Sequence, residues 1–211
     1  MSTRTVYEGF EACAAQETSA LYRLCLLLTR RREVARERAF DALLRLAARD
    51  EKDPRSDQIL LLGAAVRLCE DWELRQMRRA PSRRERQNLV RALSLPEEGW
   101  ESACRLPFAA RAALALTSAG LSPEDIGQIA GKRAQGAAKS LPPEALHASE
   151  AIVLSPEEAQ LLCDRVYDRF SERDVRLENQ LHALHARFER AAPLLALCVL
   201  ALFALALWVT R

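Results

Sequence analysis

The sequence predicts an all-α protein, and two observations carry that prediction. The 211 residues are rich in Ala, Leu, Arg and Glu, which favour helices, and they include only 7 Gly. No stretch shows the strict polar and apolar alternation of a half-buried strand, and the one strand-like run, residues 151–154, has no second strand to pair with. We expect two small helical domains, a juxtamembrane amphipathic helix and one C-terminal membrane-spanning helix.

The first predicted domain covers residues 1–80. A helical block over residues 7–48 carries apolar residues at helical spacing in two stretches, which three consecutive arginines separate. A loop with a proline is expected at residues 50–57, and a helix with an apolar stripe begins at about Gln58. Residues 81–104, which contain two prolines and a glycine, are interpreted as a linker with one short helix.

The second predicted domain covers residues 105–141. Ser122 is a natural N-cap for a helix over residues 123–130, because Pro suits the first helical position and two acids follow it. Gly131 ends that helix, and a further short helix runs as far as two consecutive prolines. A helix, a short turn with Gly and a second helix form the helix-turn-helix pattern, although an ordinary helical hairpin would look similar.

The tail of the chain has three predicted parts. Residues 142–154 are interpreted as a second linker. Ser155 and Glu158 have the spacing of a capping box and begin an amphipathic helix over residues 155–190. Residues 191–210 carry no charge and include seven Leu, and at ~1.5 Å per residue they span roughly 30 Å, the thickness of a bilayer core.

The orientation of the predicted membrane span follows from the arginines beside it. Five arginines lie in the twenty-odd residues before the span, and only Arg211 follows it. The positive-inside rule then places the N-terminal domains in the cytoplasm, with the chain held to the inner membrane as a single-pass protein. A buried core helix is the alternative for residues 191–210, but its outward face would need polar residues.

The charges of the chain are unevenly distributed. Residues 1–93 carry 19 Lys and Arg against 14 Asp and Glu, whereas residues 94–190 carry 11 against 15. Seven arginines fall between Arg75 and Arg91 with Glu85 as the single acid. This density suits contact with phosphates, an acidic partner or an anionic membrane surface, and a solvated helix face is the alternative.

Catalytic and metal sites are not expected. The six cysteines are far apart, without a Cys-x-x-Cys pair, and are interpreted as buried free thiols. His182 and His185 lie three residues apart, but no third metal ligand is evident. No Ser-His-Asp set, Gly-rich phosphate loop or paired-carboxylate site is present, so we expect a protein that is not an enzyme and takes no cofactor.

Three segments carry a resemblance to a known family, and together they span roughly residues 7–141. They are Leu21-Tyr22-Arg23-Leu24 with Leu28-Thr29, then Ala65-Val66-Arg67-Leu68-Cys69-Glu70-Asp71-Trp72, and finally Leu121-Ser122-Pro123-Glu124-Asp125-Ile126. They resemble, in this order, the opening of region 2, the helix that ends region 2 and the first motif helix of region 4 in bacterial sigma factors of the extracytoplasmic-function type.

The resemblance implies binding of core RNA polymerase through region 2 and recognition of promoter DNA by both regions. The residues that could contact DNA phosphates are Arg75, Arg78, Arg79, Arg83 and Arg84. Those on or just before the second motif helix, which could face a major groove, are Lys132, Arg133, Gln135 and Lys139.

Two departures from the family pattern keep other functions open. Arginines replace part of the acidic cluster expected over residues 32–39, and Pro142 cuts off the basic extension of the second motif helix. The leading hypothesis is a membrane-tethered transcription regulator, for which a regulatory membrane protein would be a further partner. The alternatives are an interaction protein, such as an anti-sigma factor or scaffold without promoter recognition, and an adaptor whose arginines bind anionic lipid.

Overall fold

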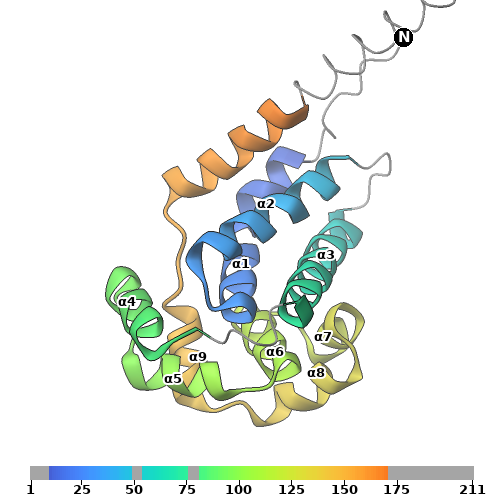
Figure 1. Cartoon of the computed structure of the whole chain (residues 1–211). Helices are drawn as coiled ribbons and strands as arrows, with labels where there is room; N and C mark the ends of the chain where they lie inside the picture. Colours follow the sequence, from blue (N-terminus) through green and yellow to red (C-terminus); the bar gives the residue numbers. More distant parts are fainter. Residues whose placement is uncertain (1–9, 49–53, 76–80, 171–211) are drawn as a thin grey trace, which may run out of the picture. The chain divides into compact units, whose positions relative to one another are not determined.

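The computed structural model describes residues 10–48, 54–75 and 81–170, and these residues are helical without any strand. The prediction of an all-α protein is confirmed for this part of the chain. The described residues from 10 to 167 belong to one compact unit, which Figure 1 shows as a set of packed helices. The predictions made for residues 171–210, namely most of the amphipathic helix, the histidine pair and the membrane span, lie outside the described residues.

The first three helices pack against one another. They are α1 (Phe10–Thr29), α2 (Arg32–Ala47) and α3 (Pro54–Arg75). Arg30 ends α1 because it adopts the left-handed conformation, with φ of 58°, and its N–H donates to the carbonyl of Leu26 at 2.7 Å. The side chains between the helices are apolar and fully or almost fully buried, among them Leu24, Cys25, Leu28, Leu43, Leu62 and Cys69.

Helix α3 begins earlier than the sequence pattern indicates. The loop predicted over residues 50–57 contains the first turn of α3, which starts at Pro54 rather than near Gln58. A proline is tolerated there because the first turn of a helix has no partner for its N–H groups. Asp57 lies in this first turn, where its negative charge complements the helix dipole.

The segments predicted as linkers are largely helical. Residues 81–104 hold α4 (Arg83–Leu93) and nearly all of α5 (Glu97–Arg105), and residues 142–154 hold α9 (Pro143–Glu150). Local capping explains α4, since Ser82 and Glu85 form a complete capping box. Burial explains α5, whose Trp100 is fully buried while α5 and α9 pack closely on each other. Prolines at both predicted linkers start helices instead of excluding them.

Helix α6 (Phe108–Ser118) lies in the middle of the unit and packs against α1, α5, α7, α8 and α9 (Figure 1). Its buried positions are mostly alanines, which allow several helices to approach at once. After the turn at Gly120 come α7 (Pro123–Ala130), α8 (Lys132–Ala137) and the 3-10 turn η1 (Ala138–Ser140). These bounds agree with those predicted from the sequence.

A final helix over residues 156–170 follows the irregular segment 151–155. The strand-like run at residues 151–154 is therefore not a strand, and its Ile152 and Leu154 are buried as part of a loop. In the described part of the chain, no helix is long and apolar enough to cross a membrane.

Candidate nucleic-acid interface

The helix-turn-helix candidate is built from α7, the turn at Gly131 and α8. Ser122 caps α7, because its hydroxyl accepts the N–H of Asp125 at 3.2 Å and donates to the carboxylate of the same residue at 2.7 Å. Gly131 has φ of 84° and ψ of 170°, a backbone conformation that side chains with a Cβ rarely adopt. The turn that sets the angle between the two helices therefore depends on glycine.

Small and apolar residues hold α8 against its neighbours. Ile126 and Ala134 are almost or fully buried, and α8 packs on both α6 and α7. A Cβ placed on Gly127 would lie 3.1 Å from the side-chain carbonyl carbon and oxygen of Gln135. Gly127 thus permits the close approach of α7 and α8, and part of the Gln135 side chain packs against Gly127.

The basic residues predicted on α8 are exposed. Lys132 and Arg133 lie in its first turn, and Lys139 lies in η1, all three open to solvent, whereas Gln135 is half-buried. Helix α8 has only six residues before the 3-10 turn, after which Pro142 follows an extended Leu141. The arrangement offers three cations to phosphates and a short helix face to base edges.

The other predicted DNA contacts in the described part of the chain lie on α3 and α4. Arg75 is exposed at the end of α3, which packs on α7, while Arg83 and Arg84 are exposed in the first turn of α4. Figure 1 shows α4 and α8 well apart, so the structure does not bring the α4 arginines together with those of α8. Arg78 and Arg79 lie outside the described residues.

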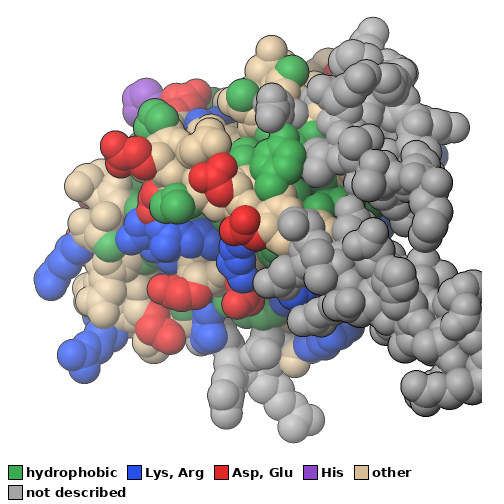
Figure 2. Space-filling model, turned by 90° about the horizontal axis from the view of Figure 1, so that it is seen from above, with side chains coloured by type: hydrophobic (Ala, Val, Ile, Leu, Met, Phe, Trp, Pro, Cys, Tyr) green, Lys and Arg blue, Asp and Glu red, His purple; other side chains and the backbone are tan. Residues whose placement is uncertain are grey.

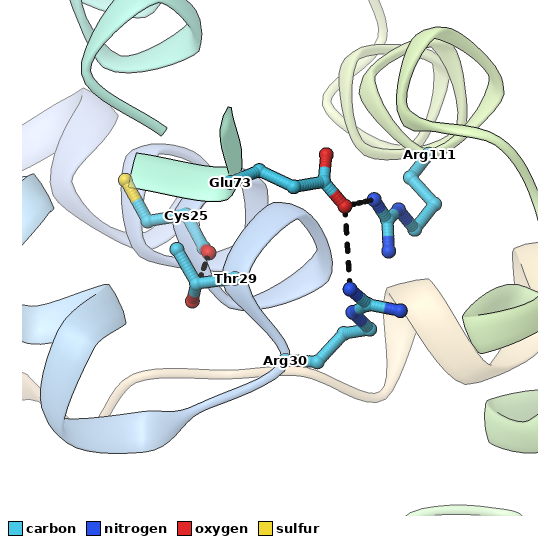
Figure 3. A network of polar contacts seen from close by, with 5 residues as sticks. All are labelled: Cys25, Thr29, Arg30, Glu73 and Arg111. Atoms are coloured by element: carbon cyan, nitrogen blue, oxygen red, sulfur yellow. Dashed lines mark hydrogen bonds and ion pairs between the residues drawn. The ribbon is translucent and has the colours of Figure 1, made fainter. Parts of the chain in front are cut away.

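Several arginines form ion pairs between helices instead of facing solvent, and the sequence did not indicate this. Glu73 near the end of α3 accepts from Arg30 at 3.2 Å and from Arg111 of α6 at 2.5 Å (Figure 3). The side chain of Arg111 is only 3% exposed, and burial, followed by the charge of Arg111, lowers the pKa of Arg30. One carboxylate therefore holds two guanidinium groups between α1, α3 and α6.

Two further arginines hold elements together. Arg23 of α1 donates to the carbonyls of Ser118 at 2.9 Å and Ile152 at 3.2 Å. Arg86, which belongs to the arginine-rich segment, pairs with Glu101 of α5 at 3.0 Å and donates to the carbonyl of Pro81. The partners are separated by 5 to 129 residues along the chain, so no local sequence pattern could have revealed most of them.

The face shown in Figure 2 carries Lys and Arg side chains interspersed with Asp and Glu, rather than an unbroken basic area. This mixture is consistent with the pairing of arginines to nearby acids that the ion pairs record. The half-buried thiols of Cys13 and Cys104 are held in the protonated, unreactive form, since burial raises the pKa of each to about 11.

Comparison with known proteins adds no identification: no protein-family model matches the chain, and neither curated proteins nor solved structures give a significant match.

Proposed function

We propose that this protein is a membrane-tethered, non-catalytic transcription regulator of the sigma-factor type, which binds core RNA polymerase and promoter DNA. The observation that carries the proposal is the α7–α8 pair. Ser122 caps α7, Gly131 turns the chain into α8, and Lys132 and Arg133 open α8 exposed to solvent, which is the order of elements in a helix-turn-helix. The three-helix bundle of α1 to α3 stands where the sequence resembles region 2.

DNA binding by α8 can be tested with a charge reversal. We expect Lys132→Glu combined with Arg133→Glu to weaken binding of promoter DNA at least tenfold and to flatten its dependence on salt, because two phosphate contacts are lost. The matched control is Arg45→Glu with Arg105→Glu, which reverses two exposed arginines outside the predicted set and outside the arginine-rich segment. The full-length chain is titrated with fluorescent promoter DNA at several salt concentrations. Equal affinity of the two double variants would refute the role of α8.

Polymerase binding and transcription, measured together, distinguish the transcription regulator from a protein that only docks on polymerase. We expect the full-length chain to capture core RNA polymerase and to support run-off transcription from its promoter. A second candidate, a docking protein that keeps the fold without reading promoters, is favoured by the brevity of α8 and by the mixed charges of Figure 2. Capture of polymerase without transcription would select that candidate, and absence of capture would remove both.

The tether is proposed from residues 191–210, twenty residues without a charge. We expect the full-length chain to sediment with membranes and to resist extraction at high salt or high pH. Leu197→Arg combined with Leu200→Arg should release it, because each arginine near the centre of a span costs about 2.5–3.5 kcal/mol on insertion. Retention of that double variant in the membrane would argue for lipid contact by the basic segments instead.

A further inference from the structure

The helix over residues 156–167, here called the arm, lies against the hairpin of α1 and α2. Its Leu162 and Val166 are buried, four residues apart on one face. At its far end, the ring of Tyr167 meets the ring of Phe10 edge to face, with 5.7 Å between centroids. In its last turns, the guanidinium of Arg165 lies 4.5 Å from the ring centre of Phe40 in α2.

An acidic contact anchors the start of the arm. Glu158 accepts from Arg32 at 2.9 Å and also pairs with Arg36, both on α2, and its backbone N–H donates to the hydroxyl of Ser155 at 3.2 Å. Partial burial raises the pKa of Glu158, but the two arginines and Ser155 outweigh burial and hold this pKa below its ordinary value. The carboxylate is therefore bound in its charged form.

The α2 arginines that bind the arm also lie close to a buried tyrosine of α1. Arg32 and Arg36 are roughly one-third exposed and pair with Glu158, and they occupy the segment where an acidic polymerase-docking cluster was expected. Below them lies Tyr22 of α1, almost fully buried and close enough to both arginines and to Glu158 for their charges to act on its pKa. Removal of the arm would open a basic and aromatic surface on the hairpin.

The two ends of the arm are held differently. Its N-terminal end is fixed, because Ile152 and Leu154 of the preceding loop are buried and Arg23 binds the carbonyl of Ile152. Beyond that point, one helical face and a few half-exposed polar contacts hold it, and Leu161 on the opposite face is 65% exposed. A single amphipathic helix of this length gains its stability from docking and not by itself.

We propose that the arm is an intramolecular ligand that masks a protein-binding surface on the α1–α2 hairpin, and that tension or a partner acting on the segment after the arm unmasks it. The surface, formed by Arg32, Arg36, Phe40 and Tyr22, suits an acidic amphipathic helix, the chemistry that the arm itself presents. This inference rests on the proposed function in one respect: the partner that binds the unmasked α1–α2 surface is taken to be core RNA polymerase.

Release of the arm is tested by hydrogen exchange in the full-length chain. We expect Glu158→Arg to accelerate amide exchange in residues 159–167 at least tenfold, while α7 amides stay unchanged and show that the rest of the unit is folded. Glu157→Arg is the matched control, an identical charge change at the exposed neighbouring residue. Adding Arg32→Glu and Arg36→Glu to Glu158→Arg should restore protection. Equal exchange in the two single variants would overturn the proposal.

Masking is tested separately from release, with a fluorescent peptide of residues 155–170 and with core polymerase. The peptide should bind Glu158→Arg at least tenfold more tightly than the native chain or Glu157→Arg, because only the opened surface is vacant. Comparable peptide binding to all three chains, or none to any, would overturn masking without bearing on transcription. Capture of polymerase should rise about tenfold in Glu158→Arg. If no chain captures polymerase, the proposed function fails, while the peptide result still decides whether the arm masks a binding surface.

Discussion

At the scale of single residues, charge pairs decide which arginines serve the fold and which face solvent. Glu73 lies between two guanidinium groups, one of them almost completely buried, and a third arginine, Arg86, acts on the same region. A carboxylate in this position does more than form one ion pair, because it allows cations of like charge to be buried side by side. The hydroxyl of the neighbouring Thr29 donates a hydrogen bond to the carbonyl of Cys25 at 2.7 Å, in the last turn of α1 (Figure 3).

We expect Glu73→Gln to lower the free energy of unfolding by about 3 kcal/mol, because it leaves Arg111 buried without a counter-charge. Replacing Arg111 by Met in the same chain should recover a large part of this loss, since the unpaired charge is then gone. Urea unfolding followed by tryptophan fluorescence measures both. Asp41→Asn, which breaks the half-exposed pair with Arg38, is the control and should cost less than about 1 kcal/mol. Equal losses in Glu73→Gln and Asp41→Asn would contradict this account.

At the scale of elements, glycine determines how closely two helices approach. A Cβ on Gly99 of α5 would lie 2.3 Å from the carbonyl oxygen of Glu144 and 2.9 Å from the Cβ of Ala148, both on α9. Gly63 is also a buried helical glycine, but a Cβ there would meet nothing within 4 Å. The same residue type therefore has a packing requirement in α5 and none in α3.

The two glycines give a matched pair of substitutions. Gly99→Ala should destabilise the protein by about 1–3 kcal/mol, because α5 and α9 must move apart. Gly63→Ala should stabilise it by about 0.5–1 kcal/mol, since alanine restricts the unfolded chain and fills open space. Thermal unfolding of both variants beside the native chain is the measurement. Destabilisation by Gly63→Ala would show that α3 has no room for a Cβ at this position.

Helix α4 ends at a residue with a strained backbone conformation, and a substitution can relieve this strain. Ser94 adopts the left-handed conformation with φ of 51°, is exposed, and uses only its backbone N–H to close the helix. Ser94→Gly should therefore raise the free energy of unfolding by about 0.5–1 kcal/mol, because glycine adopts this conformation without a Cβ penalty. Chemical denaturation is adequate to detect it. A loss of stability would mean that the serine side chain contributes a contact of its own.

At the scale of the whole molecule, helices and their caps followed from local sequence, but packing between distant segments did not. The bounds of α7 and the start of α8 agree with prediction, because Ser122 and Gly131 mark them locally. One short helix was predicted within residues 81–104, where the structure has two. Helix α9 was not predicted, because Pro142 and Pro143 were interpreted as ending a helix whereas they begin one. The exposed Lys132 and Arg133 were named from the sequence, whereas the partners of Arg23, Arg30 and Arg36 depend on tertiary contacts.

The docking of the arm should depend on pH through Glu158. Its pKa is below the ordinary 4.5 in the folded chain, so its stabilising contribution is complete above pH 4.5 and is lost as pH falls through the folded pKa. The groups facing it are Arg32 and Arg36 on α2 and Tyr22 on α1. We expect the difference in melting temperature between the native chain and Glu158→Gln to be constant from pH 5 to pH 7 and to shrink at lower pH. A difference that persists at pH 3 would contradict this linkage.

The contact between Phe10 and Tyr167 joins a residue near the start of the unit to the last residue of the unit. During synthesis, α1 leaves the ribosome long before Tyr167 is made. The bundle of α1 to α3 must therefore persist while the side of α1 that contacts Tyr167 is still uncovered. Contacts between residues so distant in sequence also slow the final stage of folding. A nascent chain paused before residue 156 would expose on its hairpin the apolar and cationic side chains that a chaperone recognises.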